Sequence, residues 1–351
     1  MNPLTRVPVG IVGASGYSGI EATRILARHP HVELTFVSSD KFEGQSVQRL
    51  LGLGGEVGAL KYVPQKSVEA LAAKCRVVLL ATPAEVSLEL APKLLAQGVR
   101  VVDLSGAFRL QDPALYPKAY GFAHHHAALL PEAVYGMPEL SRARIADARL
   151  VANPGCYPTV SVLGVLPFLK AGLVEEDSII IDAASGVTGA GRKATEEMSF
   201  TEVNEDFRAY KVLKHQHTPE IAQALSVASG AAVPVVFTPH LLPVKRGILA
   251  TIYARLKPGV DPAQPAHLLG TAWRNEAFVT VVEKPEDVNL KTVVGTNRVH
   301  VGVACEGRQL VACASMDNLV KGAAGQAVQN LNLMMGWDEG TALTELRGFY
   351  P

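Results

Sequence analysis

Short apolar runs alternate with amphipathic stretches along the first half of the chain. The apolar runs cover residues 7–12, 32–37, 61–65, 77–81, 99–104 and 150–152. Between them, residues 20–29 and 85–97 repeat their apolar positions with the period of a helix. This alternation is typical of a doubly wound parallel sheet, whose ligands bind at the carboxyl ends of the strands. The pattern therefore predicts a Rossmann-type α/β domain over residues 1–153.

The second half of the chain has a different pattern, in which strands follow one another with few helices between them. The apolar runs here are 178–183, 233–239, 248–256, 279–283, 299–306 and 309–315. Such a succession favours a largely antiparallel sheet. We therefore expect an α+β domain over residues 154–316, followed by a C-terminal segment, 317–351, that begins with a long amphipathic helix.

Composition narrows the function classes. The chain has 351 residues, of which 48% are hydrophobic, so it has ample material for two folded domains. Lys+Arg and Asp+Glu are both 33, which leaves no net charge to attract nucleic acid or an anionic membrane surface. Four cysteines are too few for a disulfide framework, which favours the reducing cytoplasm. We see no signal peptide and no apolar run of the ~18 residues that a membrane span needs.

The first strand runs into a glycine-rich turn, Gly13-Ala14-Ser15-Gly16-Tyr17-Ser18-Gly19, which opens the first helix. Glycines in this position let the backbone approach a pyrophosphate that rests on the helix N-terminus. The alternative is an ordinary strand–helix turn, but the strand and helix on either side favour a dinucleotide site. The candidate cofactor residues in the turn are Gly13, Ser15, Gly16, Tyr17, Ser18 and Gly19.

The second strand ends in Ser38-Ser39-Asp40-Lys41. An acidic residue at this position holds the ribose 2′-hydroxyl of NAD, so Asp40 points towards NAD. Two hydroxyls and a lysine suit a 2′-phosphate instead, and on balance we expect NADP, with Ser38 and Ser39 as ligands. The ends of other strands add Thr82, Pro83 and Ser105 to the expected cofactor residues.

A single cysteine lies among turn residues in Asn153-Pro154-Gly155-Cys156-Tyr157-Pro158-Thr159. Pro154 and Gly155 favour a turn, and Pro158 and Thr159 favour a helix start. Cys156 is therefore expected at a helix N-terminus, whose partial positive charge favours the nucleophilic thiolate. The alternative is a small buried hydrophobic residue in a turn.

A histidine lies at another predicted helix start, in His217-Thr218-Pro219-Glu220. A histidine takes a proton from a thiol and returns one to a substrate, so His217 is the candidate acid/base. Glu220, three residues later, is placed either to orient the ring or to cap the helix. The alternative for His217 is an ordinary polar surface residue.

Two arginines follow predicted strands, and a guanidinium binds carboxylate or phosphate bidentately. Arg109 follows the strand at 99–104, and Arg192 ends the glycine-rich stretch 185–192. Which of them would hold the carboxylate and which the phosphate of a substrate stays open. Surface positions are the alternative for both.

A long irregular stretch, residues 111–138, contains His124-His125-His126. A loop of this length usually has a function or forms a lid. Consecutive side chains point in different directions, and no Cys or His at metal-ligand spacing accompanies them. We therefore predict no metal site.

Taken together, these motifs resemble those of the N-acetyl-γ-glutamyl-phosphate reductases, within the aspartate-semialdehyde dehydrogenase superfamily, and the similarity extends along essentially the whole chain. The motif Asn318-Leu319-Val320-Lys321-Gly322 belongs to the same resemblance. The resemblance implies NADPH-dependent reduction of the small molecule N-acetyl-L-glutamyl 5-phosphate to N-acetyl-L-glutamate 5-semialdehyde and phosphate, in arginine biosynthesis. It also implies a homo-oligomer, commonly a tetramer.

The resemblance assigns Cys156 as nucleophile and His217 as acid/base. It places Asn318 near the nicotinamide, with Ser185 and Gly186 as further cofactor residues, so that the last helix would pack back on the first domain. The expected substrate residues are Arg109, Asn153, Arg192 and Glu220. In the thioester mechanism that follows, we expect the Asn153 side chain and backbone N–H groups at the Cys156 turn to stabilise an oxyanion.

Two other functions compete with this interpretation. One is the same chemistry on another acyl phosphate, either an aspartyl phosphate or a carrier-linked aminoadipyl phosphate. The neutral charge of the chain does not favour an acidic carrier protein. The other is a non-catalytic NADP-binding regulator, which would tolerate the loss of Cys156.

Overall fold

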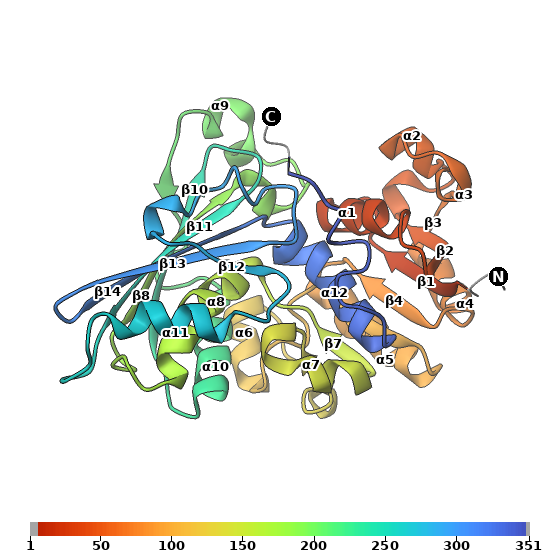
Figure 1. Ribbon diagram of the computed structural model, residues 1–351. Helices are drawn as coiled ribbons and strands as arrows, with labels where there is room; N and C mark the ends of the chain where they lie inside the picture. The colour runs from red at the N-terminus through yellow and green to blue at the C-terminus, as the bar shows by residue number, and fades with distance from the viewer. Residues whose placement is uncertain (1–5, 349–351) are drawn as a thin grey trace. The chain divides into compact units, whose positions relative to one another are not determined.

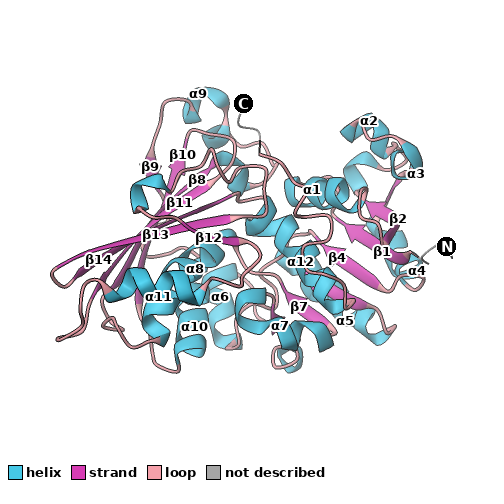
Figure 2. Ribbon diagram, viewed as in Figure 1, coloured by secondary structure: helices cyan, strands magenta, loops and turns pink. Residues whose placement is uncertain are grey.

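Seven strands form the sheet of the first half of the molecule, in the order β3-β2-β1-β4-β5-β7-β6 (Figures 1 and 2). The computed structural model describes residues 6–348. All paired neighbours in this sheet are parallel. The strands are β1 Val7–Val12, β2 Val32–Ser38, β3 Tyr62–Val63, β4 Val77–Leu80, β5 Arg100–Asp103, β6 Val134–Tyr135 and β7 Leu150–Ala152. The predicted parallel sheet is confirmed.

Both faces of this sheet are buried under helices. Val78, Leu80 and Val101 pack on one face with apolar residues of α5 (Ala84–Ala96) and α4 (Val68–Ala72). The alternate strand residues are buried as well, which is the pattern of a doubly wound fold. Helices α1 (Tyr17–Leu26) and α7 (Pro138–Asp147) both contact α12 (Gly325–Met334), so the last helix belongs to this unit. The shorter helices are α2 Val47–Leu51, α3 Gly55–Ala59 and α6 Tyr116–Tyr120.

The chain divides into two compact units. Among the described residues, unit 1 takes 6–154 and 323–345, and unit 2 takes 155–322 and 346–348. The chain thus leaves unit 1 one residue after the expected boundary at 153. It returns at residue 323, whereas the expected C-terminal segment began at 317.

Unit 2 contains a mixed sheet in the order β12-β13-β14-β11-β8-β10-β9. Four of its neighbouring pairs are antiparallel, while β8–β10 and β12–β13 are parallel. The strands are β8 Ile179–Gly186, β9 Arg208–Ala209, β10 Val235–Leu242, β11 Ile248–Arg255, β12 Val279–Val281, β13 Val299–Glu306 and β14 Gln309–Met316. The expected α+β architecture is confirmed.

One face of this second sheet is covered by α8 (Cys156–Lys170), with α10 (His217–Ser229) and α11 (Gln264–Ala272) packed against it. Nearly every residue of α8 is buried, which explains why its sequence is apolar all round. Gly164 makes the close approach possible, because a Cβ there would lie 2.5 Å from Cδ1 of Ile252 on β11. The helix that carries the cysteine is therefore held firmly against the sheet.

The structure corrects several details of the expected elements. The stretch 111–138 is not a plain loop, since it contains α6 and β6. Residues 193–210, for which no element was expected, contain α9 (Phe200–Val203) and β9. These elements are too short to show a period in the sequence. Helix α11 was not expected. The long helix expected at the start of the segment 317–351 begins as a π-helix, Val320–Ala324, before α12. None of the described helices is long and apolar enough to cross a membrane.

Candidate functional site

Cys156 is the first residue of α8. Gly155 is the N-cap, with extended backbone angles (φ −68°, ψ 154°), so the chain turns into the helix immediately before the sulfur. The helix begins two residues earlier than Pro158, where the sequence indicated its start. The expectation that Cys156 lies at a helix N-terminus is confirmed, and the thiol is partly exposed.

Glu220 links this turn to the helix of the candidate acid/base. The carboxylate of Glu220, in the first turn of α10, is fully buried and accepts a hydrogen bond of 2.8 Å from the N–H of Gly155. The first turns of α8 and α10 therefore meet at this contact. Of the two roles considered for Glu220, orienting the ring or capping a helix, the contact favours a cap, but on the neighbouring helix. The contact shows that Glu220 positions the Cys156 turn, while its expected contact with substrate stays a prediction.

His217 is the first residue of α10 and is 9% exposed. Its backbone N–H donates a hydrogen bond of 3.1 Å to Nδ1 of His215. The imidazole lies 6.0 Å from the ring of Tyr157, the residue that follows Cys156 in α8. The two predicted catalytic residues thus occupy the adjoining first turns of two packed helices.

Sequence reasoning did not single out the hydroxyls of Tyr210 and of Tyr157, the residue that follows Cys156. The hydroxyl of Tyr210 donates to that of Tyr157 at 3.1 Å. Burial, and to a smaller extent the neighbouring Cys156, raises the pKa of Tyr210 to about 12. Burial also raises the pKa of Tyr157, so both phenols stay protonated near neutral pH. Tyr157 was visible next to Cys156 in the motif, whereas nothing in the sequence around Tyr210 distinguishes it.

His215 is expected to make stability depend on pH. Burial, assisted by Lys211, lowers the pKa of His215 from 6.5 to about 4. As the pH falls, His215 is protonated in the unfolded chain before it is protonated in the folded chain. The free energy of unfolding that depends on neutral His215 is therefore fully present above pH ~6.5 and is lost as the pH falls towards 4. We expect the parent to lose ~2–3 kcal/mol more than His215→Asn between pH 7 and pH 4.5, at ~1.4 kcal/mol per pKa unit. Asparagine keeps an acceptor for the His217 N–H.

Urea unfolding at the two pH values measures this difference. Equal losses in the parent and in His215→Asn would show that another group carries the pH dependence.

The glycine of the Asn318 motif has a direct steric reason. A Cβ at Gly322 would lie 2.8 Å from Cβ of Cys156. Gly322 belongs to the π-helix Val320–Ala324, and π-helical turns are frequent at functional sites. The motif therefore packs against the cysteine.

The same motif braces the glycine-rich loop after β8. The Asn318 side chain accepts the Gly247 N–H at 2.8 Å and donates to Oγ1 of Thr188 at 3.0 Å. A Cβ at Gly186 would lie 2.8 Å from the carbonyl oxygen of Val244, so the loop before β11 lies directly on this glycine. Asn318 thus lies in unit 2 with the loop that carries Ser185 and Gly186, and Arg192 beyond them is exposed.

A buried ion pair lies beside this loop. Nε of Arg246 is 3.2 Å from Oδ2 of Asp317, which is fully buried and also accepts the N–H of Gly295 at 2.7 Å. Oδ1 of Asp317 also accepts the N–H groups of Leu319 and Val320, so this side chain caps the start of the helical segment that follows.

In unit 1, the glycine turn fits a dinucleotide. Gly13 has φ +78°, and a Cβ there would lie 2.3 Å from the carbonyl oxygen of Ala81. A Cβ at Gly19 would lie 2.3 Å from the carbonyl oxygen of Gly13. Both glycines are thus required by the fold. Gly16, the N-cap of α1, differs, because a Cβ there would meet only one atom, at an ordinary 3.5 Å. The room beside Gly16 suits the close approach of a pyrophosphate.

The serines after β2 join the glycine turn. The Oγ of Ser38 accepts the N–H of Gly13 at 3.3 Å, and the hydroxyls of Ser15 and Ser39 lie 2.7 Å apart. Asp40 binds the backbone instead, because its Oδ1 accepts the N–H of Gln65 at 2.7 Å. The acidic residue that pointed towards NAD is therefore engaged with the backbone, while the hydroxyls of Ser15 and Ser39 lie side by side.

Other expected residues of unit 1 have structural roles. Arg109 is 8% exposed and donates to the carbonyl oxygens of Asn153 and Leu104, each at 2.8 Å. Asn153 is fully buried; its amide donates to Ala323 at 3.2 Å and its Oδ1 accepts from Asn330 at 3.0 Å. Both side chains are therefore held by backbone and side-chain partners inside unit 1, and a contact of either with substrate stays a prediction.

Two further expected cofactor residues have hydroxyls engaged with the protein. Ser105 donates its hydroxyl to the buried Asp103 at 2.8 Å. The hydroxyl of Thr82 lies 2.8 Å from that of Ser87, in the first turn of α5, and the neighbouring Pro83 is the exposed N-cap of that helix. Thr82 and Pro83 thus mark the end of β4, as predicted.

Comparison with known proteins identifies both units. Residues 8–148 match the NAD binding domain of semialdehyde dehydrogenases, and residues 156–318 match their dimerisation domain. Solved structures share the fold. Aspartate semialdehyde dehydrogenase II of Vibrio cholerae, complexed with ASA, has a TM-score of 0.74 at 17% identity, covering 95% of this chain and 99% of that one. The Candida albicans enzyme with NADP has a TM-score of 0.70 at 14% identity, with coverages of 94% and 99%.

Curated relatives are much more similar in sequence. The N-acetyl-γ-glutamyl-phosphate reductase of Geobacillus stearothermophilus is 46% identical over 98% of this chain and 99% of its own length. That of Magnetococcus marinus is 46% identical over 97% and 98%. That of a Cyanothece strain is 42% identical over the full length of both chains. Together with the cysteine turn and the dinucleotide turn, these matches show that the chain belongs to the N-acetyl-γ-glutamyl-phosphate reductase family of semialdehyde dehydrogenases.

Proposed function

We propose that the chain reduces N-acetyl-L-glutamyl 5-phosphate to N-acetyl-L-glutamate 5-semialdehyde and phosphate, with NADPH as reductant, in arginine biosynthesis. The observation that carries this proposal is the pair of adjoining first turns in unit 2, with Cys156 beginning α8 and His217 beginning α10. The full-length similarity to reductases named for this substrate supports it. The glycine turn and paired serines of unit 1 supply the cofactor site.

The first half of the reaction is an acyl transfer to Cys156. The thiolate attacks the acyl carbon, and the bond from that carbon to the phosphate oxygen breaks. Phosphate departs, and the acyl group stays on the sulfur as a thioester. The positive end of α8 favours both the thiolate and the oxyanion that forms during attack. Backbone N–H groups of the first turn of α8 are the proposed oxyanion donors, because the Asn153 amide is engaged elsewhere.

The second half releases the aldehyde. NADPH held at the glycine turn and the paired serines of unit 1 would supply the hydride that reduces the thioester carbon. His217 protonates the resulting oxyanion to a thiohemiacetal and removes that proton again as the carbon–sulfur bond breaks. Aldehyde leaves and Cys156 returns to the thiolate. Glu220 keeps the Cys156 turn in place through the Gly155 N–H.

Arg192 is the proposed ligand of an anionic group of the substrate. It is exposed at the end of the glycine-rich loop of unit 2, whereas Arg109 is held by backbone carbonyls. Lysine cannot reproduce a bidentate guanidinium contact. We expect Arg192→Lys to lower kcat/KM for the acyl phosphate by at least ~10-fold, which is ~1.4 kcal/mol, with NADPH affinity unchanged. Steady-state kinetics test this, and unchanged kcat/KM would remove Arg192 from the substrate site.

The cofactor preference is proposed to reside in Ser38, Ser39 and Lys41. An aspartate at position 39 would add a negative charge beside the hydroxyl of Ser15. We expect Ser39→Asp to weaken NADPH binding by ~1–3 kcal/mol, the scale of a lost charge-assisted hydrogen bond, and NADH binding much less. Fluorescence titration with both cofactors measures the two affinities. Equal kcat/KM for NADH and NADPH in the parent would contradict the preference.

The substrate is tested by measuring NADPH oxidation against a panel of acyl phosphates. N-acetylglutamyl phosphate should be preferred over aspartyl phosphate and over a carrier-linked aminoadipyl phosphate. Preference for either of the others would change the proposed pathway. No turnover with any of them, together with tight NADPH binding, would favour the non-catalytic regulator.

A homo-oligomer, such as the tetramer that the family resemblance implies, is proposed to form through the uncovered face of the second sheet. Val236, Ile180, Tyr253 and Val311 are register neighbours on β10, β8, β11 and β14, and the first three are exposed. Unit 2 also matches a family domain described as a dimerisation domain. Light scattering should give a mass that is a multiple of one chain, and a monomer would contradict the proposal.

We also propose that the protein is located in the cytoplasm.

A further inference from the structure

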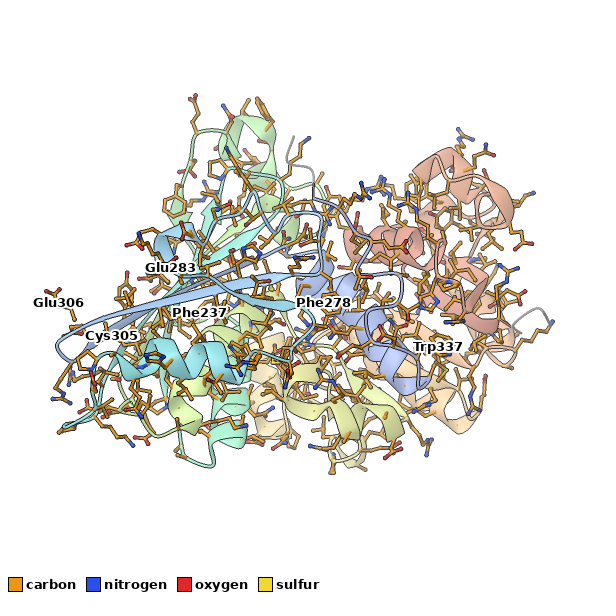
Figure 3. The ribbon with its side chains drawn as sticks, viewed as in Figure 1. Phe237, Phe278, Glu283, Cys305, Glu306 and Trp337 are labelled. Carbon is orange, nitrogen blue, oxygen red and sulfur yellow. The ribbon has the colours of Figure 1, made fainter. Side chains whose placement is uncertain are left out.

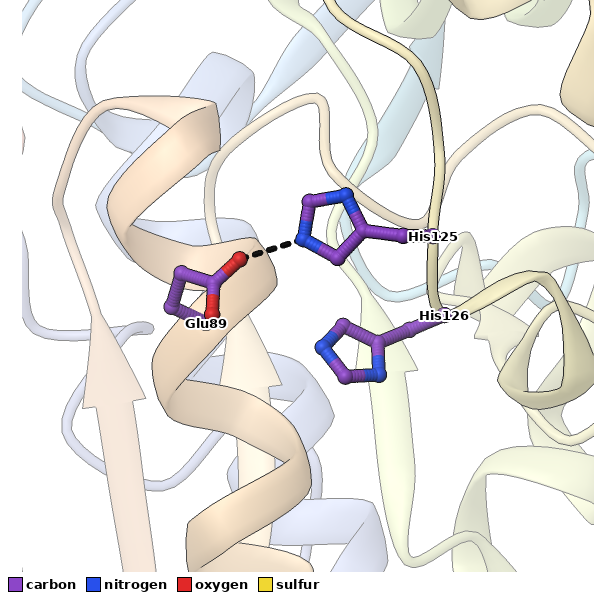
Figure 4. A group of neighbouring side chains, drawn as sticks. All are labelled: Glu89, His125 and His126. Carbon is purple, nitrogen blue, oxygen red and sulfur yellow. Dashed lines mark hydrogen bonds and ion pairs between the residues drawn. The ribbon is translucent and has the colours of Figure 1, made fainter.

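Three potential metal ligands meet on the surface of unit 1. Glu89 projects from α5, and His125 and His126 come from the loop before the short turn Ala127–Leu129 (Figure 4). Their ligand atoms all lie within 4.8 Å of one another. Among residues 6–348, no other three His, Cys, Asp or Glu side chains bring their ligand atoms so close together. No role in the proposed reaction uses these side chains.

The loop that carries the two histidines is anchored by the one before them. The ring of His124 is buried, and its Nε2 donates to the carbonyl oxygen of Ala107 at 2.8 Å. It also lies 4.5 Å from the ring of Tyr116 and 5.5 Å from that of Phe108. The two following rings therefore start from a fixed backbone.

Consecutive histidine side chains were expected to point in different directions, which spoke against a metal site. That holds for His124, which turns into the core. It is wrong for His125 and His126, whose ring centroids are only 5.0 Å apart and which both lie beside Glu89. The carboxylate comes from a helix more than thirty positions away, so ligand spacing in the sequence had no means of showing it.

His125 already has the hydrogen-bonding pattern of a metal ligand. Its Nδ1 donates to the carbonyl oxygen of Ala123 at 3.2 Å, while its Nε2 forms an ion pair with Glu89. Ligand histidines commonly donate their second ring nitrogen to a carbonyl in this way, which fixes the ring and its tautomer.

We propose that Glu89, His125 and His126 bind a divalent transition-metal ion of the Zn²⁺ type at this point on the surface of unit 1. Two imidazole nitrogens and one carboxylate oxygen suit Zn²⁺, whereas Mg²⁺ and Ca²⁺ prefer oxygen ligands alone. Metal–ligand bonds of ~2.0–2.2 Å require the three side chains to draw together slightly. Glu89 and His125 are exposed and His126 is half-buried, so at least the first two side chains are able to move in this way.

A bound ion would connect the loop at 124–126 to α5. That helix begins at Ala84, directly after Thr82 and Pro83, which are expected cofactor residues. The ion would therefore restrain the contact between α5 and the loop, and we expect it to raise the thermal stability of the chain.

Isothermal titration calorimetry with Zn²⁺ tests the site on the full-length, tag-free chain after removal of metal. The Cys156→Ser background is used throughout, so that the thiol does not compete for the ion. One Zn²⁺ should bind per chain, and Glu89→Gln and His126→Ala should each weaken binding at least ~10-fold, the minimum cost of disturbing a ligand set. Glu85→Gln is the matched control, since Glu85 is an exposed glutamate one turn earlier on α5.

Thermal denaturation with and without Zn²⁺ gives a second readout. The rise in Tm on adding Zn²⁺ should be present in Glu85→Gln and lost in Glu89→Gln and His126→Ala, whose circular dichroism without zinc checks that they are folded. Binding with the same affinity in all variants, an equal loss in Glu85→Gln, or no binding to the Cys156→Ser chain would each overturn the site. In that case the three side chains form an ion pair and no more.

Discussion

Cys156→Ser is expected to abolish reduction of the acyl phosphate while NADPH binding is retained. A serine alkoxide is far harder to form than a thiolate, and the positive end of α8 does not close that gap. The change replaces the sulfur with an oxygen. It leaves the helix start intact, because serine is well tolerated at a helix N-terminus. Loss of turnover with unchanged cofactor affinity would therefore report on the nucleophile alone.

The other cysteines provide matched controls. Burial raises the pKa of the Cys75, Cys305 and Cys313 thiols. Cys305 lies at the outer end of the β13–β14 hairpin (Figure 3). Cys305→Ser should keep full activity. Brief iodoacetamide treatment near neutral pH should label Cys156 first, and substrate should protect it. If Cys156 is labelled last, or if the serine variant turns over at the parent's rate, the cysteine is not the nucleophile.

His217→Ala is expected to slow turnover by ~10²–10⁴-fold, the usual contribution of a positioned acid/base. The side chain lies at the start of α10, on the turn that Glu220 joins to the N-cap of α8. Alanine removes the proton carrier but keeps the helix. The loss should appear in kcat, with little change in NADPH affinity, and should flatten the limb of the pH–rate profile that His217 produces.

His267→Ala is the control for this variant, because His267 is an exposed histidine on α11 of the same unit. Its activity should match the parent's. A His217→Ala variant with a normal kcat and an unchanged pH profile would assign the proton transfers to another group, and the hydroxyls of Tyr157 and Tyr210 would be the next to test.

The parts of the site that could be predicted from the sequence are those that depend on local geometry. A glycine turn between a strand and a helix, and a cysteine behind Pro154 and Gly155, determine their own backbone. The start of α10 at His217 followed from the same reasoning, within one residue. Local turn chemistry therefore located both candidate catalytic residues before any tertiary contact was known.

The parts that could not be predicted depend on contacts between distant segments. Glu220 looked like a partner for its own helix, yet it accepts from Gly155, which is 65 residues away. The Asn153 amide looked available to substrate, yet it meets Asn330, which is 177 residues away. No periodicity or spacing encodes such pairs, because they arise only when the elements pack.

The most direct test of the covalent mechanism is phosphate release in the absence of NADPH. The enzyme is mixed with excess N-acetylglutamyl phosphate, and phosphate and the intact protein mass are followed together. We expect one equivalent of phosphate per chain and an added N-acetylglutamyl group on the peptide that contains Cys156, with neither in Cys156→Ser. No phosphate before NADPH is added, or an acyl group on any other residue, would contradict a thioester on Cys156.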